Sequence, residues 1–288
     1  MQLNEIHALI QLLDDPDEGV YSHVRERLME RGHAVLPLLE QHRDAAQLAD
    51  EHASRVDELL HGLRFKQLHE RALSWAFGEE HDPVEAALIV HAAVQPRANE
   101  AEVRKAFSDL RRAVWLECNE DLTGFERLQV MNHLLFDVME FSGASGATLK
   151  PGHALLGEVM ARKRGNALGI GYLYWALARS LGLAVHLVDS PHHFLLCYCD
   201  AGSMPSATQP HGAVWCYIDP FAQGAFIAPD QIPSYLNLPD TTLPTPAPPA
   251  LGFERLIRFV SLSLLREERH FLAKHLDELT RGWGSEPA

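Results

Sequence analysis

Two short motifs place a histidine and an aspartate where they could act together. The segment SPHHF at 190–194 opens one run of strand-forming residues, and IDPF at 218–221 closes the next. In an antiparallel pair, His193 and Asp219 would lie side by side, where a carboxylate fixes the imidazole tautomer and stabilises its charged form. The motifs therefore predict a His–Asp pair of the kind found in thiol and serine hydrolases.

The long apolar segment 166–181 is the element that would present a nucleophile to this pair. Its apolar residues recur at helix spacing, and Gly182 is well placed to end the helix. The N-terminus of such a buried helix favours a thiolate, because backbone N–H groups and the helix dipole stabilise negative charge. The residues found there are Asn166, Ala167, Leu168 and Gly169. None of them is a nucleophile.

Other side chains could replace the missing nucleophile. Cys197 and Cys199 share the strand face of His193 but lie about 13 and 20 Å along it, at roughly 3.3 Å per residue. Cys216 should face away from Asp219. Ser190 would complete a formal Ser-His-Asp set, but no helix would supply its oxyanion hole. We expect the three thiols to be buried apolar groups, as we do Cys118, which falls in a helix far from the motifs.

Metal and anion binding are the other chemistries that these residues suggest. Adjacent histidines on a strand point to opposite faces, and no H-E-x-x-H or paired C-x-x-C spacing is present. We therefore predict neither a metal nor a cofactor, although a metal site would draw on His186, His192, His193 and Cys199. The basic turn at 162–164 could bind an anion near the helix N-terminus, but a solvated turn is the favoured interpretation.

The elements that must position these residues divide into a helical part and a mixed part. Residues 1–80 show helix periodicity, interrupted as in one HEAT-like unit, with no second copy of the repeat. Residues 81–228 combine helices with a core at 150–228, in which short strands are predicted at 185–188, 194–199 and 214–218. Seven of the seventeen prolines predict an extended connector over 229–252, and 253–288 predict an amphipathic helix. The predicted fold class is α+β, a buried helix packed on a small antiparallel sheet.

The composition limits the partners. Lys and Arg number 25 and Asp and Glu 39, which gives a net charge of −14 and argues against nucleic acid. No apolar run approaches the roughly 18 residues that cross a bilayer. The first residues carry acids where a secretory signal carries a basic flank, and four cysteines are too few for a disulfide framework. We expect a cytoplasmic protein with reduced thiols and no nucleic acid or membrane partner.

The motifs in order resemble the transglutaminase-like superfamily, and specifically its bacterial branch named after SirB-one. That branch shows an R-x-G-x-P-x-x-L helix, a P-G-H-F-L strand and an I-D-P-F-x-x-G strand, and the matching segments are RKRGNALGIGYLYWALARSLGLAVHLVDSPHHFLL and WCYIDPFAQGAF. The resemblance implies a papain/transglutaminase-like core, with His193 matching the catalytic-type histidine and Asp219 its aspartate. Counted back from the helix end, the superfamily cysteine falls at or close to Ala167. The branch commonly lacks this cysteine, but His192 and Ala167 depart from its own Gly and Pro.

These observations leave three functional hypotheses. The first is a non-catalytic binding or regulatory module, in which a vestigial His193 and Asp219 groove recognises a protein partner. The alternative is a hydrolase or acyltransferase that uses these two residues with a cysteine or an activated water. The third is an interaction module that acts through the N-terminal helices.

Overall fold

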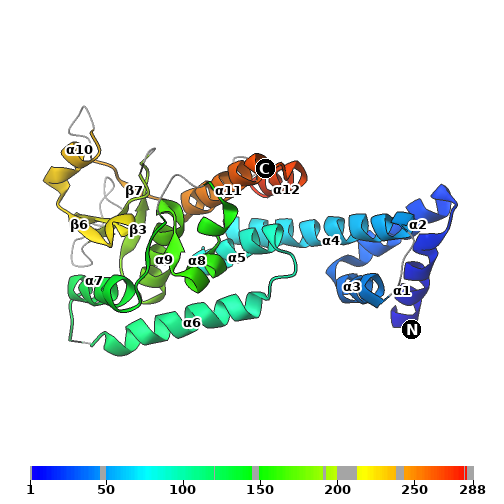
Figure 1. Ribbon diagram of the computed structural model, residues 1–288, viewed down its shortest axis with the longest axis horizontal. Coiled ribbons are helices and arrows are strands. Elements are labelled where there is room, and N and C mark those ends of the chain that lie inside the picture. Colours follow the sequence, from blue (N-terminus) through cyan, green and yellow to red (C-terminus); the bar gives the residue numbers. More distant parts are fainter. Residues whose placement is uncertain are drawn as a thin grey trace. The chain divides into compact units, whose positions relative to one another are not determined.

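The computed structural model describes residues 2–45, 50–119, 121–144, 149–190, 193–199, 213–237, 243–281 and 283 (Figure 1). The chain divides into two compact units, Met1–Ser74 and Trp75–Ala288. This division lies a few residues before the boundary predicted at residue 80. Each unit has its own core, so the two are described separately.

The first unit is helical. It contains α1 (Gln2–Gln11), α2 (Glu18–Arg31), α3 (Leu36–Ala45) and most of α4 (Asp50–Ala76). Aliphatic side chains from all four helices and their connections form one buried cluster: Ile6, Ile10, Leu13, Val24, Leu28, Val35, Leu36, Leu39, Val56, Leu59, Leu60 and Leu63. Burial of this apolar stripe is the main force that holds the helices together.

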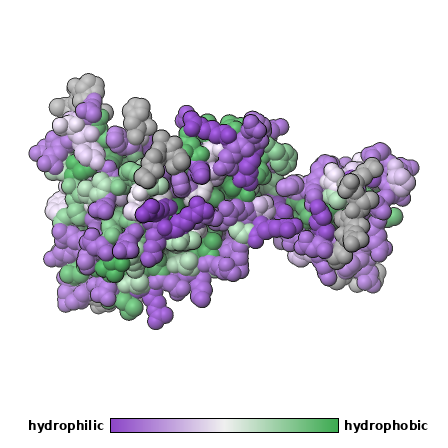
Figure 2. All heavy atoms as spheres, in the orientation of Figure 1, coloured by the Kyte–Doolittle hydropathy of each residue, from purple (hydrophilic) through white to green (hydrophobic). Residues whose placement is uncertain are grey.

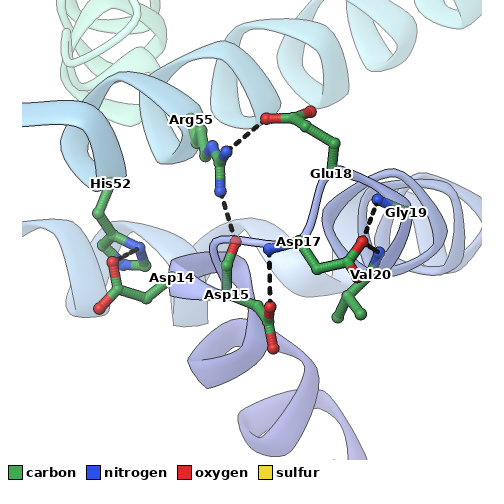
Figure 3. Close-up of polar contacts among 8 residues, drawn as sticks. All are labelled: Asp14, Asp15, Asp17, Glu18, Gly19, Val20, His52 and Arg55. Carbon is green, nitrogen blue, oxygen red and sulfur yellow. Dashed lines mark hydrogen bonds and ion pairs between the residues drawn. The ribbon is translucent and has the colours of Figure 1, made fainter.

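The acidic turn between α1 and α2 is fixed by hydrogen bonds (Figure 3). Asp17 caps α2, because its side chain accepts hydrogen bonds from two backbone N–H groups of the first turn, including Gly19 N at 2.7 Å. Arg55 of α4 donates to the Asp15 carbonyl at 2.8 Å and to Glu18 Oε1 at 2.6 Å. The turn is therefore attached to α4 as well as to the helix it begins.

The second unit begins with helices and continues into a sheet. Its early helices are α5 (Pro83–Val94), α6 (Glu100–Glu117) and α7 (Gly124–Asn132), and α7 continues as a π-helical turn, η3 (His133–Val138). Asp82 caps α5 and Pro83 occupies its first turn. After α7 come a two-stranded parallel pair, β1 (Ser142–Gly143) and β2 (Arg164–Gly165), the turn η4 (Pro151–His153) and the short helix α8 (Leu156–Arg162).

Five antiparallel strands form the main sheet, in the order β6-β5-β4-β3-β7. They are β3 (Val185–Val188), β4 (Leu196–Cys199), β5 (Val214–Asp219), β6 (Ala225–Ile227) and β7 (Pro246–Ala247). β4 and β5 pair with Leu196 opposite Ile218, so the end of β5 lies beside the residues that precede β4. This register brings the two sequence motifs to the same end of the sheet.

The helix α9 (Ala167–Ser180) packs against this sheet (Figure 1). Its side chains from Ile170 to Ala178 are buried, and Gly182 follows it with a positive φ of 72°. The hydroxyl of Tyr172 donates to the Pro83 carbonyl at 3.1 Å, and that of Tyr174 donates to Asn132 Oδ1 at 2.7 Å. A buried helix on a small antiparallel sheet, preceded by helices, confirms the predicted α+β fold class.

The Pro-rich segment is less extended than the sequence predicts. It contains the short helices η6 (Pro229–Gln231) and α10 (Ile232–Tyr235), and residues 238–242 lie outside the described residues. Its later prolines contribute β7, an edge strand, and the start of α11 (Pro249–Arg266). Proline fits both places, because an edge strand and the first turn of a helix leave backbone N–H groups unpaired.

The C-terminal region is two helices rather than the single one predicted. α11 ends at Arg266, and α12 (His270–Glu278) follows after a reversal in which Glu268 adopts a positive φ of 60°. Neither Gly nor Pro marks this break in the sequence. Both helices pack on each other and on α5.

The surface of the second unit carries hydrophobic patches among hydrophilic residues (Figure 2). Its exposed large hydrophobic residues include Trp115, Leu116, Trp215, Leu262 and Phe271. Within the described residues, the helices are too short or too polar to pass through a bilayer.

Candidate functional site

A cavity of about 760 Å³ lies at the N-terminus of α9. Three parts of the chain form its walls: the first residues of α9, the segment between β3 and β4, and α11. The lining residues are Asn166, Ala167, Leu168, Asp189, Ser190, His193, Phe194, Leu251, Glu254, Arg255, Arg258, Phe259 and Leu262. We refer to this cavity as the α9 groove.

The helix begins at the groove because Asn166 caps it. Asn166 Oδ1 accepts a hydrogen bond from Gly169 N at 2.7 Å, and the Asn166 N–H donates to the His153 carbonyl at 3.0 Å. Gly169 is required for this approach, since a Cβ there would lie 2.1 Å from the same His153 oxygen. The cap thereby presents Ala167 and Leu168 to the groove.

His193 reaches the same groove from the segment before β4, next to Phe194. The Phe194 ring packs where α9 carries Gly171, at which a Cβ would lie 2.1 Å from a ring carbon. The structure thus brings together two of the predicted site residues, His193 and Ala167. At the helix tip that lines the groove, the side chain of residue 167 is a methyl group.

Asp219 is held by neighbours other than His193. Its Oδ1 accepts hydrogen bonds from the backbone N–H groups of Phe221 and Ala222, at 2.9 and 3.1 Å. Its Oδ2 accepts one from the Tyr235 hydroxyl at 2.5 Å. The hydrogen bonds that the described residues give to this carboxylate do not include one from His193.

Tyr235 connects the two motif residues and was not a sequence candidate. Its ring centroid lies 6.2 Å from that of His193, and its hydroxyl bonds to Asp219. Burial and the hydrogen bond to Asp219 raise the pKa of Tyr235 to about 12, so it remains a donor at neutral pH. Tyr235 belongs to the Pro-rich segment, which the sequence presents as a connector, and no local pattern marks its contact with β5.

Arg255 is the second residue that sequence reasoning missed. From α11 it donates to the carbonyls of Val188 and Ser190, at 3.3 and 2.8 Å, and to Asp189 Oδ1 at 3.0 Å. Burial lowers the pKa of Arg255, although Asp189 opposes this effect. These bonds fix the segment that leads from β3 to His193, so Arg255 positions one wall of the groove.

The thiols of the sheet are buried and lie outside the residues that line the groove. Cys197, Cys199 and Cys216 are free, as is Cys118 on its helix end. Cys197 and Cys199 belong to a cluster on one sheet face with Tyr217 and Ile232. The hydrogen bond with Cys199 and burial raise the pKa of Cys197 well above its usual range, and burial raises the pKa of Cys216 to about 11. Cys197 and Cys216 are therefore protonated at neutral pH and poorly nucleophilic, whereas the hydrogen bond with Cys197 lowers the pKa of Cys199, whose side chain is fully buried.

The remaining candidates give no further ligand set. Within the described residues, no group of three or more His, Cys, Asp or Glu side chains is placed to hold a metal ion. His186 lies on β3, whereas His192 lies outside the described residues. In the basic turn, Arg162 pairs with Glu158 at 2.7 Å, and Lys163 takes a left-handed φ of 54° to end α8.

Comparison with known proteins identifies the family of this chain. The family model of the transglutaminase-like superfamily matches residues 101–244, which include α9, the motif strands and Tyr235. The chain therefore belongs to the transglutaminase-like superfamily. No solved structure gives a significant match.

A curated relative is similar over a shorter segment. F-box only protein 21 of Homo sapiens is 29% identical over 102 residues, which cover 34% of this chain and 15% of that protein. The proteins of the same name from Pongo abelii and Mus musculus are 29% and 28% identical over the same length. The match thus spans about one seventh of the length of these relatives, and the rest of each relative lies outside the matched segment.

Proposed function

We propose that this protein is a non-catalytic recognition module, and that its α9 groove binds a segment of a partner protein. The observation that carries the proposal is the helix tip itself. Ala167 stands at or close to the position where the superfamily resemblance puts the nucleophilic cysteine, and it lines the same groove as His193. An alanine methyl cannot attack an acyl carbon, so the groove would retain binding surface without covalent chemistry.

The lining of the groove suits a peptide. Backbone N–H groups at the start of α9 and the guanidinium of Arg258 can bind carboxylate or carbonyl oxygens. Glu254 offers an acceptor, and Phe259 and Leu262 offer apolar contact. A volume of about 760 Å³ is within the usual range for small ligands and short peptide segments. In this proposal His193 and Asp219 are a vestigial pair, with Tyr235 holding the aspartate in place.

The alternative is a hydrolase or acyltransferase that uses His193 and Asp219. Its thiol form is disfavoured, because the hydrogen bond with Cys199 and burial raise the pKa of Cys197, burial raises that of Cys216, and neither residue lines the groove. Its water-dependent form requires His193 to act as a base on a water bound in the groove. An assay for hydrolysis of glutamine peptides and aryl esters, with the wild type beside His193→Ala, separates this alternative from the proposal. Turnover lost in the variant would establish the alternative.

The binding test uses two leucines of α11. Leu262 lines the groove and Leu265 does not, yet both are large exposed side chains, at 49% and 41%. Peptides selected from a random displayed library on the full chain should bind the wild type and Leu265→Asp equally. They should lose most of their binding to Leu262→Asp. Selected peptides that bind both variants as well as the wild type would contradict the proposal.

Location and partner type belong to the same proposal. Four free thiols suit the reducing conditions of the cytoplasm, and the net charge of −14 favours a protein partner over nucleic acid. Salt dependence of peptide binding would show how far Arg258 contributes.

A further inference from the structure

Two histidines of the first unit contact each other where two of its helices meet. His42 lies in the last turn of α3 and His52 in the first turn of α4, and their Nε2 atoms are 3.0 Å apart. The two rings meet edge to face, with centroids 5.3 Å apart. His52 is only 4% exposed, so this contact replaces hydration of its ring.

Asp14 extends the contact into a polar chain through both rings. It ends the turn η1 (Leu12–Asp14), and its Oδ1 atom lies 3.2 Å from His52 Nδ1 (Figure 3). A carboxylate at this distance favours a proton on Nδ1 and leaves His52 Nε2 as an acceptor. His42 Nε2 then carries the proton of an N–H···N hydrogen bond. The chain of contacts therefore joins η1, α3 and α4.

Protonation decides whether the hydrogen bond between the rings can exist. With neutral rings, or with one added proton, one Nε2 atom is a donor and the other an acceptor. A second proton leaves two N–H groups facing each other and puts two positive charges in contact. The start of α4 also disfavours a cation at His52, because the helix dipole is positive at that end. The doubly protonated pair thus repels where the neutral pair binds.

The charged groups around the pair respond differently to pH. Burial and His52 lower the pKa of His42, and Asp14 opposes this effect. His7 of α1 and Asp44 of α3 are exposed. Other charged side chains of the packed helices form Arg–carboxylate pairs, namely Arg43–Asp57, Arg64–Glu40, Arg55–Glu18 and Arg31–Glu5. These pairs stay charged between pH 5 and 7, so pH changes in this range act on the histidine contact rather than on them.

We propose that the His42–His52 contact is a pH-sensitive latch between α3 and α4. It is closed while the pair holds at most one added proton, and it opens when both rings are protonated. Leu39 of α3 shares one buried apolar cluster with Val56 and Leu59 of α4. Opening of the latch would expose part of that cluster.

Hydrogen–deuterium exchange of the full chain tests the latch. Exchange of peptides from residues 36–45 and 52–60 is measured at pH 6.5 and pH 5.5 and corrected for the intrinsic effect of pH. Because the open form binds one more proton, its population should rise by up to about tenfold per pH unit below the ordinary histidine pKa of about 6.5. Protection of these peptides should fall about three- to tenfold. Unchanged protection would overturn the proposal.

His42→Gln and His23→Gln form a matched pair of variants. Glutamine retains a donor for His52 Nε2 but does not titrate, so most of the pH dependence should disappear in His42→Gln. His23 is exposed on α2, and its variant should lose protection as the wild type does. A loss in His42→Gln equal to that of the wild type would overturn the latch.

Ring ¹⁵N spectra of the wild type give a test that depends on no variant. Two histidines should titrate as a coupled pair, in two steps separated by more than about one pH unit. The second step should lie below the ordinary histidine pKa. Independent titration of every histidine near pH 6.5 would contradict the proposal.

Discussion

Gly169→Ala tests how tightly the start of α9 is fixed. In most helices this substitution stabilises by at most about 1 kcal/mol. Here the new Cβ would lie 2.1 Å from the His153 carbonyl oxygen and 3.1 Å from Ala154 Cα, both backbone atoms. Overpacking of this kind costs about 1–3 kcal/mol. The displaced carbonyl would also lose its hydrogen bond from Asn166 N, which contributes about 1 kcal/mol. The net expectation is a destabilisation of about 1–3 kcal/mol.

Tryptophan fluorescence during urea unfolding reports on the stability of the second unit, which contains α9. All five tryptophans lie in the second unit, and the buried Trp175 is on α9 itself. The urea midpoint of the fluorescence transition should fall for Gly169→Ala.

Gly62→Ala in α4 is the matched control, because its Cβ would lie an ordinary 3.6 Å from Met29 atoms. That variant should stabilise the first unit by about 0.5–1 kcal/mol, as followed by circular dichroism. An unchanged or raised midpoint for Gly169→Ala would refute the packing argument.

Three further predictions concern the contacts around the groove. Arg255→Ala should lower the stability of the second unit by about 2–3 kcal/mol, because it removes hydrogen bonds to the segment after β3, and Arg255→Lys should restore only part of it in urea unfolding. Tyr235→Phe should cost about 1–3 kcal/mol in the same measurement, because Asp219 loses a donor; no loss would mean that the hydroxyl is dispensable. The pKa of Tyr235 is raised to about 12 from its ordinary 10, so its contribution to stability is complete below pH 10 and lost as the pH rises toward 12. Urea midpoints at pH 9 and pH 11.5 should therefore differ less for Tyr235→Phe than for the wild type.

The elements nearest the motifs were predictable from the sequence because local patterns determine them. Helix spacing and the following Gly182 predict α9, and strand-forming residues between Pro and Gly predict β3 at its observed bounds, Val185–Val188. The α+β class follows from these elements. The π-helical turn after α7 and the break at Glu268 have no such local signal.

The contacts that build the site depend on tertiary structure. Tyr235 reaches Asp219 across 16 residues, and Arg255 reaches Val188 across 67. Nothing in the spacing of these residues indicates which carboxylate or carbonyl each will bind. The sequence predicted a direct His193–Asp219 pair, which remains a prediction, whereas the structure adds a tyrosine that contacts both residues.

Alkylation by iodoacetamide at pH 7, measured by intact mass and peptide mapping, tests the recognition-groove account most directly. Ala167→Cys would restore a thiol at the helix N-terminus, where backbone N–H groups lower a thiol pKa. The account predicts rapid alkylation at residue 167 in this variant, faster than at Cys118. It also predicts that Cys197, Cys199 and Cys216 of the native wild type stay unmodified over the same time. Rapid modification of any of those three cysteines in the wild type, or a residue 167 thiol no faster than Cys118, would contradict it.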